Sequence, residues 1–168
     1  MNKKVIIVAT VVGTIVLAAV VILVSLFFRE KIVPEKFSID ECRLLSARDI
    51  KSVIGGDEVT EIPPLRTDGQ CREMLVSMEG TGEKSTPKNT ITLSIIDTKV
   101  VPSYNQIEVK DYLSSICSGS SLEIGEYNSC SFAGFVFFGK GKYMLQLNCP
   151  GCSEEKKIEL SKLINGRL

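Results

Sequence analysis

Two cysteines separated by a proline and a glycine, Cys149-Pro150-Gly151-Cys152, have the spacing that could do chemistry most directly. They follow a segment with strand character and precede a helical segment, and the positive end of a helix dipole favours a thiolate. Thiol–disulfide oxidoreductases use this local arrangement, so a redox function with Cys149 and Cys152 is one hypothesis. In those enzymes the motif lies early in a βαβ unit, whereas here it comes late and no parallel sheet is predicted. A structural disulfide is therefore the favoured interpretation.

The chain has six cysteines, and an even number at this density is typical of domains in oxidising compartments. Sequence alone leaves several connectivities open. A bridge from Cys42 to Cys71 would join the opening helix to the first long strand. Cys117 and Cys130 flank a link rich in Ser and Gly, which leaves a local pair. The favoured pairs are Cys42 with Cys71, Cys117 with Cys130, and Cys149 with Cys152.

The composition argues against other kinds of site. The chain has no His, which removes the commonest general base near neutral pH and the commonest metal ligand. A zinc site would need a second close Cys pair or a His partner, so neither a metal nor another cofactor is expected. Gly139-Lys140-Gly141 fits a hairpin turn better than a phosphate-binding loop. Four carboxylates fit capping and solvated roles better than an acid–base pair: Asp40, Glu41, Asp57 and Glu58.

Charge is balanced over the whole chain, with 20 Lys and Arg against 20 Asp and Glu. Lys3 and Lys4 precede the apolar run described next, so the rest of the chain is slightly acidic. This balance leaves no basic face for nucleic acid, and none is expected as a partner. Four phenylalanines gather in one segment. Their default place is the core, but an exposed ring among them could contact a protein partner: Phe132, Phe135, Phe137 and Phe138.

The N-terminal region contains a run of 24 residues, Val5 to Phe28, without a charge. A helix rises about 1.5 Å per residue, so roughly 20 apolar residues cross the hydrocarbon core of a bilayer. A buried helix of a globular domain would show a polar face, and this run shows none. The sequence therefore predicts that Val5 to Phe28 contacts the lipid bilayer, as a membrane span or as a signal segment.

A permanent signal anchor is favoured over a cleaved signal peptide. The run ends in Leu26-Phe27-Phe28-Arg29-Glu30, and bulky and charged residues suit a signal peptidase poorly. Lys and Arg counts on the two sides nearly balance, so the positive-inside rule gives only a weak orientation. The cysteines determine the predicted orientation of the anchor, because disulfides form outside the cytoplasm. The prediction is a single-pass protein of the cell membrane, with a cytoplasmic N-terminus and an extracytoplasmic C-terminal domain.

The sequence divides into a cytoplasmic tip and transmembrane anchor (residues 1–29), a linker (30–40) and one α+β domain (41–168). Short connections between adjacent strands predict an antiparallel sheet packed with helices, in the order α-β-β-β-α-β-β-β-α. Hydrophobic periodicity predicts helices over residues 42–54, 109–117 and 153–164, and strands over residues 58–62, 71–79, 90–98, 122–127, 131–138 and 142–148.

Capping residues bound two of these helices. Ser46 and Asp49 occupy the capping-box positions of the first domain helix, and Gly55-Gly56 ends it. Ser153 is a natural N-cap for the last helix, whose first turn is acidic. An exposed loop is expected over residues 80–89, which are rich in Gly, Ser, Thr, Pro and Lys.

The domain opens with Asp40-Glu41-Cys42-Arg43-Leu44-Leu45-Ser46, followed by Asp49-Ile50 and Val53-Ile54-Gly55-Gly56. This pattern resembles small extracytoplasmic lipoproteins of unknown function that are common in actinobacteria. Those proteins open with an Asp-x-Cys-x-Leu-Leu-type segment and place a second cysteine at the start of an early strand, matched here by Cys71. The likeness extends loosely over residues 38–167. This chain departs from the pattern because it lacks a lipidation cysteine, so a transmembrane anchor would replace the lipid, and it carries four further cysteines.

The leading hypothesis is a membrane-tethered extracytoplasmic domain without catalytic activity, which binds a partner or accompanies a membrane complex. The alternative is a membrane-anchored thiol–disulfide oxidoreductase that uses Cys149 and Cys152. A redox enzyme needs an exposed, reactive thiol, whereas a structural bridge does not. A third hypothesis is a structural subunit whose anchor packs against other membrane helices through Gly13, Ala18 and Ala19.

Overall fold

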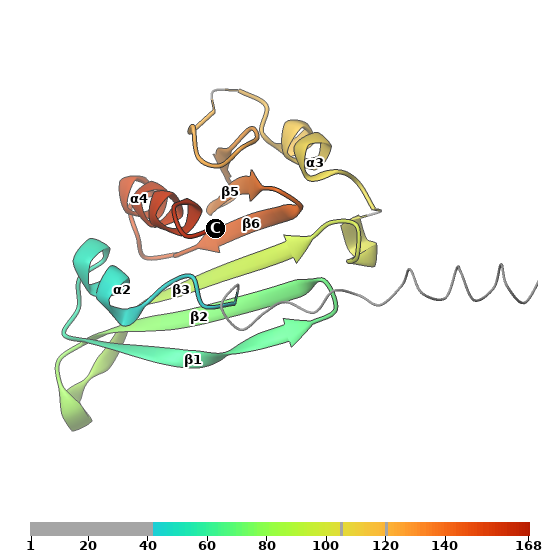
Figure 1. Ribbon diagram of the computed structural model, residues 1–168. Coiled ribbons are helices and arrows are strands. Elements are labelled where there is room, and N and C mark those ends of the chain that lie inside the picture. The colour runs from blue at the N-terminus through green and yellow to red at the C-terminus, as the bar shows by residue number, and fades with distance from the viewer. Residues whose placement is uncertain (1–41, 105, 120) are drawn as a thin grey trace, which may run out of the picture. The chain divides into compact units, whose positions relative to one another are not determined.

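The computed structural model describes residues 42–104, 106–119 and 121–168, which form an α+β fold. The α-helices of this part are α2 (Ala47–Val53), α3 (Val109–Ile116) and α4 (Glu154–Asn165). The strands are β1 (Glu58–Thr67), β2 (Gln70–Glu79), β3 (Thr86–Asp97), β4 (Cys130–Phe132), β5 (Phe135–Lys140) and β6 (Tyr143–Asn148), with 3-10 turns at Gly82–Lys84 and Pro102–Tyr104 (Figure 1). The α+β class and the antiparallel sheet predicted for the domain are confirmed, and the order of helices and strands agrees, although two of the strands that follow α3 differ from those predicted.

The predicted anchor, Val5 to Phe28, and the predicted linker, residues 30–40, lie outside the described residues. Within the described ranges, no helix is both long enough and apolar enough to cross a membrane.

All six strands join one antiparallel sheet, in the spatial order β1-β2-β3-β6-β5-β4. Buried and more exposed residues alternate along β2, because successive side chains of a strand point to opposite faces. Helices α2 and α4 contact each other and cover one face of the sheet (Figure 1). The main core lies between these layers and contains Ile50 of α2, Leu75 of β2, Leu145 of β6 and Leu160 of α4.

Helix α3 packs on the opposite face, over β5 and β6. Its residues Val109 and Leu113 form a second buried cluster with Phe137 of β5 and Met144 of β6. The helix approaches the sheet closely because residue 139 is glycine. A Cβ at Gly139 would lie 2.7 Å from a methyl group of Val109 and 2.8 Å from one of Leu113.

We expect Gly139→Ala to lower the free energy of unfolding by about 1 to 2 kcal/mol, because the added methyl group overpacks the contact with α3. Urea unfolding measures this change. Gly166→Ala is the matched control, since a Cβ there would meet only ordinary contacts, at 3.6 Å and 3.7 Å. Equal effects of the two substitutions would contradict the close packing of α3 on β5.

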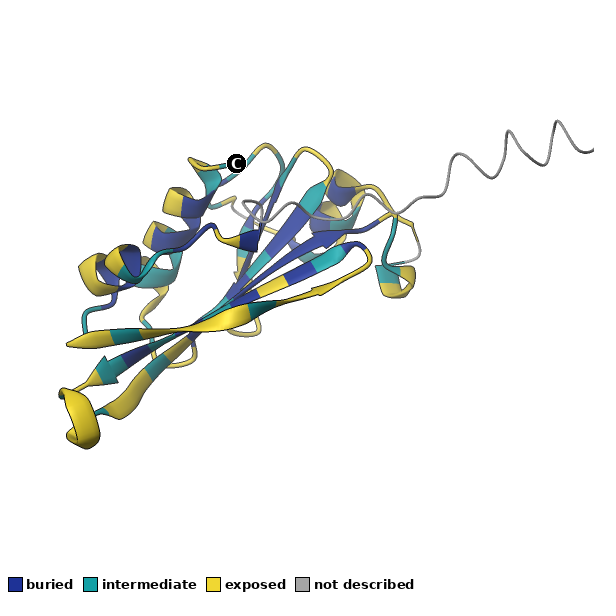
Figure 2. Cartoon of the chain, turned by 60° about the horizontal axis from the view of Figure 1, so that its bottom comes forward, coloured by how far each residue is buried: buried dark blue, intermediate teal, exposed yellow. Residues whose placement is uncertain are grey.

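Strand β1 is longer than predicted. We expected it to stop before Pro63-Pro64, but it continues to Thr67 through an irregularity in which the register shifts between Ile62 and Leu65. An edge strand tolerates proline at such a bulge, because one side of its backbone has no partner strand. The bulge lies opposite Glu73 of β2. Most residues of β1 are exposed, and the strand is therefore largely yellow in Figure 2.

The predicted strand over residues 122–127 is wrong. These residues form a loop, and Gly125 alone makes an isolated bridge to β5. Glu123 and Gly125 have φ values of 55° and 84°, in the left-handed region that regular strands do not contain. The loop is held instead by Ser129, whose hydroxyl accepts a hydrogen bond from the backbone N–H of Ile124 at 3.1 Å.

The predicted strand over residues 131–138 is instead the hairpin β4–β5. Ala133 and Gly134 reverse the chain between the two strands, with φ values of 50° and 85°. Positive φ at both central residues is what a two-residue hairpin turn of type I′ requires. This hairpin supplies the strand that residues 122–127 do not form. The loop expected over residues 80–89 is shorter than predicted, because β3 already begins at Thr86.

Candidate functional site

The first described residues, Cys42–Ser46, are fastened to the sheet and are here named the opening segment. The predicted helix from residue 42 was placed too early, since residues 43–46 are not helical and α2 begins at Ala47. Ser46 starts the helix as predicted: its hydroxyl accepts from Asp49 N at 3.3 Å, and its own N–H donates to the Asp49 carboxylate at 2.7 Å. The backbone before this capping box is held by another strand instead of by helical hydrogen bonds.

A disulfide fastens the opening segment to β2. Cys42 and Cys71 are both fully buried, and their Cα atoms lie 5.8 Å apart. The other two bridges join Cys117 to Cys130 and Cys149 to Cys152, each with a Cα separation of 5.3 Å. These are the three pairs favoured from the sequence. No described cysteine is free.

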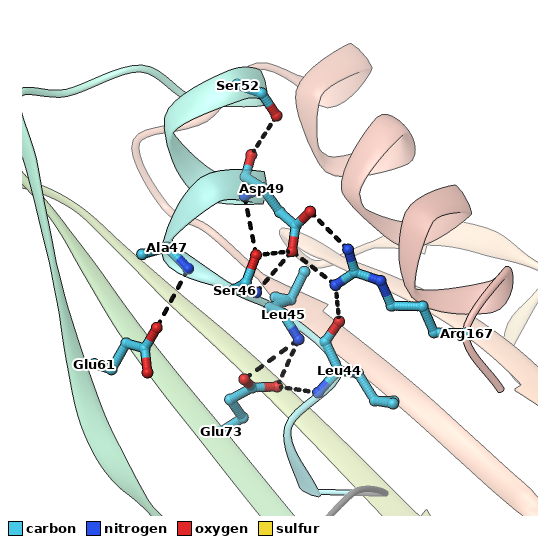
Figure 3. A network of polar contacts seen from close by, with 9 residues as sticks. All are labelled: Leu44, Leu45, Ser46, Ala47, Asp49, Ser52, Glu61, Glu73 and Arg167. Atoms are coloured by element: carbon cyan, nitrogen blue, oxygen red, sulfur yellow. Dashed lines mark hydrogen bonds and ion pairs between the residues drawn. The ribbon is translucent and has the colours of Figure 1, made fainter.

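The second fastening is the buried carboxylate of Glu73, which lies two residues after Cys71 on the same face of β2. One oxygen accepts hydrogen bonds from Leu44 N at 3.1 Å and from Leu45 N at 3.2 Å (Figure 3). The other oxygen accepts from Leu45 N at 3.3 Å. Only 5% of Glu73 is exposed to solvent. The carboxylate therefore satisfies two backbone N–H groups that precede the first turn of α2.

Burial raises the pKa of Glu73 to about 7, from an ordinary value of 4.5. Desolvation disfavours the ionised form, and the negative charge of nearby Glu61 acts in the same direction. The hydrogen bonds from Leu45 and Leu44 and the positive charge of Arg43 oppose this rise without cancelling it. Glu73 is thus a buried acid that titrates near neutral pH.

The third fastening comes from Arg167, just after α4. Its guanidinium makes two hydrogen bonds of 2.7 Å to the Asp49 carboxylate and also donates to the carbonyl of Leu44 (Figure 3). Paired hydrogen bonds of this kind are the strongest that arginine and a carboxylate form. The hydrogen bonds from Arg167 lower the pKa of Asp49 to about 2, so this carboxylate stays ionised in all but strongly acidic solution.

We expect Arg167→Ala to lower the free energy of unfolding by about 1 to 2 kcal/mol at pH 7, because it leaves the largely buried Asp49 carboxylate without its cation. The expected loss is modest because the Arg167 side chain is 40% exposed, and solvent screens its attraction to Asp49. Thermal or urea unfolding measures it. Lys162→Ala, which removes an exposed cation from the last turn of α4, should change little. A loss in the control as large as in Arg167→Ala would contradict a specific contribution of the Arg167–Asp49 ion pair to stability.

The Cys149-Pro150-Gly151-Cys152 motif lies between β6 and the start of α4, as predicted. Its surroundings are packed: Cys149 is fully buried, and the partly buried Cys152 contacts the main core. A Cβ at Gly151 would lie 2.1 Å from the side-chain amide group of Asn89 on β3. The sheet beside the motif is antiparallel, so the βαβ setting of thiol–disulfide oxidoreductases is not present among the described strands.

The phenylalanines and carboxylates that the sequence singled out lie in the core, in backbone contacts or on the surface. Of the four phenylalanines, Phe138 is fully buried, Phe137 is 9% exposed, and Phe132 at the sheet edge is 58% exposed. Asp57 accepts a hydrogen bond from Gly80 N at 2.7 Å, and Glu58 is an exposed residue of β1. Asp40 and Glu41 lie outside the described residues. No group of His, Cys, Asp and Glu suited to a metal ion occurs in the part that the structure describes.

A cavity of about 450 Å³ lies between the β5–β6 turn and the residues that follow α4. Its polar groups support the fold: Lys140 Nζ donates to the carbonyl of Asn165 at 2.9 Å, and Glu126 accepts from Gly141 N at 2.8 Å. Arg167, which also lines the cavity, is held by Asp49. Lys140, Glu126 and Arg167 are thus all engaged in contacts that support the fold.

On the face that carries α3, the part over β1 and β2 has no described helix packed on it, whereas Ser94 and Ile96 of β3 are buried on the same face. One row of paired residues crosses the whole sheet on this face and carries no charge: Ile62, Met74, Thr92, Asn148, Phe135 and Phe132. Ile62 is 40% exposed, so the row is exposed at both edges of the sheet. It offers a mixed apolar and hydroxyl- or amide-bearing surface.

Comparison of the chain with protein-family models, with curated proteins and with solved structures finds no match.

Sequence reasoning missed Glu73 and Arg167. A signal for Glu73 was present, because it lies on the buried face of β2 together with Cys71, Leu75 and Ser77. A charged residue in that phase must find hydrogen-bond partners. Arg167 gave no such signal, since its partner Asp49 is 118 residues away.

Proposed function

We propose that the chain is a single-pass, membrane-tethered protein whose disulfide-stapled domain lies outside the cytoplasm and acts as a non-catalytic binding or accessory module. The fastening of the opening segment carries this proposal. The segment directly after the predicted anchor and linker is held by a disulfide, by Glu73 and by Arg167. Such multiple fastening suits a domain that is held through its N-terminal end.

The extracytoplasmic location is supported by the three disulfides, since such bonds persist in oxidising compartments. It also agrees with the resemblance to extracytoplasmic lipoproteins, in which a lipid holds the domain where we infer a transmembrane helix. The apolar run Val5 to Phe28 has the length of such a helix.

A binding or accessory role is supported by the uncharged row on the open sheet face, from Ile62 to Phe132. Antiparallel sheets with one wet face usually carry polar side chains there, so apolar side chains on it favour contact with another protein. The ionisable groups of the opening segment and its surroundings serve the fold, which supports a role other than catalysis.

The alternative, a tethered thiol–disulfide oxidoreductase, is favoured by one observation. Cys152 is only partly buried and directly precedes the N-cap of α4, where a thiolate would be stabilised. Its partner Cys149 is fully buried. A redox role would require reduction to expose a reactive thiol at this position.

Membrane fractionation and protease protection of the full chain test the proposal. We expect the chain to stay in membranes after an alkaline carbonate wash and its domain to be digested by protease added outside intact spheroplasts. The double variant Leu17→Arg with Val20→Arg, which puts two charges in the apolar run, should lose the membrane association, because each charge is costly at the centre of a bilayer. The matched variant with alanine at both positions should keep it. A domain that protease reaches only after lysis would overturn the proposal.

A further inference from the structure

We propose that residues 58–62 of β1, here named the pairing edge, bind the same residues of a second copy of this chain as antiparallel strands in one register. In this register Thr60 of each copy lies opposite Thr60 of the other, at a two-fold axis. The pairing goes beyond the proposed function, because it is a property of the domain and exists wherever the protein resides.

Strand β1 has a partner on one side only. It pairs with β2, and no described strand lies on its other side, at the lower rim of the sheet in Figure 1. Of the five residues of the pairing edge, only Val59 is partly buried, and the other four are exposed. Backbone N–H and C=O groups on the open side of such a strand are a template for another strand.

The pairing edge lacks the features that usually shield an edge strand, which are short length, prolines, bulges and lysines. The opposite edge of the sheet, β4, is only three residues long, and the second half of β1 contains the Pro63-Pro64 bulge. Residues 58–62 contain no proline and no lysine, and they pair with β2 in an unbroken register. They therefore form a regular, accessible strand that the bulge limits at one end.

One of the two charges of the pairing edge is engaged within its own copy. Glu61 pairs with the buried Leu75, so its side chain lies on the face of the sheet that α2 covers. Its carboxylate accepts a hydrogen bond from the backbone N–H of Ala47, the first residue of α2, at 3.3 Å (Figure 3). This contact holds the charge of Glu61 against α2.

The sequence of the pairing edge is complementary to itself about Thr60. A two-fold axis at this residue places Glu58 opposite Ile62 of the second copy, and Val59 opposite Glu61 of the second copy. No like charges face each other, and the threonine hydroxyls at the centre can form a cross-strand hydrogen bond. This self-complementarity favours a second copy as the partner.

Other positions of the axis are less favourable. An axis at Val59 would place Glu61 opposite Asp57 of the second copy, and an axis at Glu61 would place this residue opposite itself. Like charges directly opposite each other destabilise a strand pair. Larger shifts place Glu58 opposite itself or bring the prolines of the bulge into the new ladder, where they cannot donate. Charge and proline positions therefore specify the register centred on Thr60.

The pairing would enlarge the surface that supports a binding role. Because the axis is perpendicular to the sheet, both copies present the same face on the same side, and their strands form one continuous antiparallel sheet. Ile62, which is 40% exposed, then lies diagonally beside Thr60 of the second copy on this face. The uncharged rows of the two copies become parts of one surface.

Cysteine cross-linking of the full chain in detergent micelles tests the pairing. The six native cysteines form three disulfides, so a single added cysteine supplies the free thiol. Mild oxidation of Thr60→Cys should link two copies, because Cβ atoms of directly opposite residues lie about 4.5 to 5.5 Å apart. Leu65→Cys is the control, since Leu65 is 61% exposed on the same strand but lies beyond the bulge. No link in Thr60→Cys, or equal linking of the two variants, would overturn the proposal.

Two further variants test the register. Since Glu58 lies opposite Ile62 of the second copy, chains with Glu58→Cys should link to chains with Ile62→Cys when the two are mixed. Either variant alone should link much less. Links within each variant as abundant as those in the mixture would contradict the axis at Thr60.

Sedimentation of the full chain in detergent measures the strength of the pairing. Thr60→Lys places two positive charges opposite each other and should weaken the dimer roughly five- to tenfold, whereas Thr60→Ser keeps a hydroxyl and should change it by about twofold or less. A wild-type chain that forms no dimer, or equal dimerisation of the two variants, would overturn the proposal. A domain located inside the cell would overturn the proposed function and leave these results standing.

Discussion

Replacing Cys42 and Cys71 together by alanine should lower the free energy of unfolding by about 3 to 4 kcal/mol. The bridge spans 29 residues and therefore restricts a long loop of the unfolded chain. It also fixes the residue from which the opening segment starts. Urea unfolding of the full chain in detergent, followed by circular dichroism, measures the loss.

The local bridge provides the matched control for this prediction. Cys149 and Cys152 are only three residues apart, so the same double replacement there should cost about 2 kcal/mol or less. A larger loss at the local bridge than at Cys42 and Cys71 would contradict our view that the long bridge carries more of the stability. It would also show that the motif between β6 and α4 is a main support of the fold.

The domain should become less stable by about 2 to 3 kcal/mol between pH 5 and pH 8, because of Glu73. The folded protein raises the pKa of Glu73 to about 7, whereas the unfolded chain has the ordinary value of 4.5. Within this window the folded state binds a proton that the unfolded state has released. Stability is therefore full below about pH 4.5 with respect to this group and falls as the pH rises through 7. Urea unfolding at several pH values measures the slope.

Two variants isolate the contribution of this one carboxyl. Glu73→Gln should remove most of the slope between pH 5 and pH 8, whatever its effect on stability at a single pH. Glu79→Gln is the control, because Glu79 ends the same strand but its side chain is 67% exposed. The wild-type slope should be retained in this control. A flat wild-type profile, or a slope that survives in Glu73→Gln, would contradict the account.

Acid affects the domain through a different residue. The pKa of Asp49 is lowered to about 2, chiefly by its hydrogen bonds with Arg167, so its contribution is present above pH 4 and is lost as the pH falls through 2. Glu73 and Asp49 thus act in opposite directions. Stability should be greatest in mildly acidic solution.

Much of the domain could be predicted because its signals are local. Alternation along β2 and β3, the capping box of Ser46 and Asp49, and the spacing of Cys117 and Cys130 depend on residues close in sequence. The errors arose where local patterns were ambiguous. Residues 122–127 have apolar residues that suit a strand, but left-handed backbone at Glu123 and Gly125 prevents one.

The site could be predicted only in part, because its contacts are long-range. Cys42 and Cys71 were identifiable from their types and number. The hydrogen bond between Leu44 and Glu73 joins residues that are 29 positions apart, and the ion pair of Arg167 with Asp49 joins residues that are 118 positions apart. Pro63-Pro64 suggested that β1 ends there, whereas these prolines lie in a bulge of this edge strand, beside Glu73. Only the assembled sheet makes these neighbours apparent.

The measurement that most directly tests an exported, disulfide-stapled and non-catalytic domain is mass spectrometry of the alkylated chain isolated from membranes, before and after mild reduction. We predict no free thiol, with all six cysteines resistant to mild reductant in the pairs Cys42–Cys71, Cys117–Cys130 and Cys149–Cys152. Six free thiols in the protein from its native host would contradict the extracytoplasmic location. Selective labelling of Cys149 or Cys152 would contradict the non-catalytic assignment and favour the redox alternative.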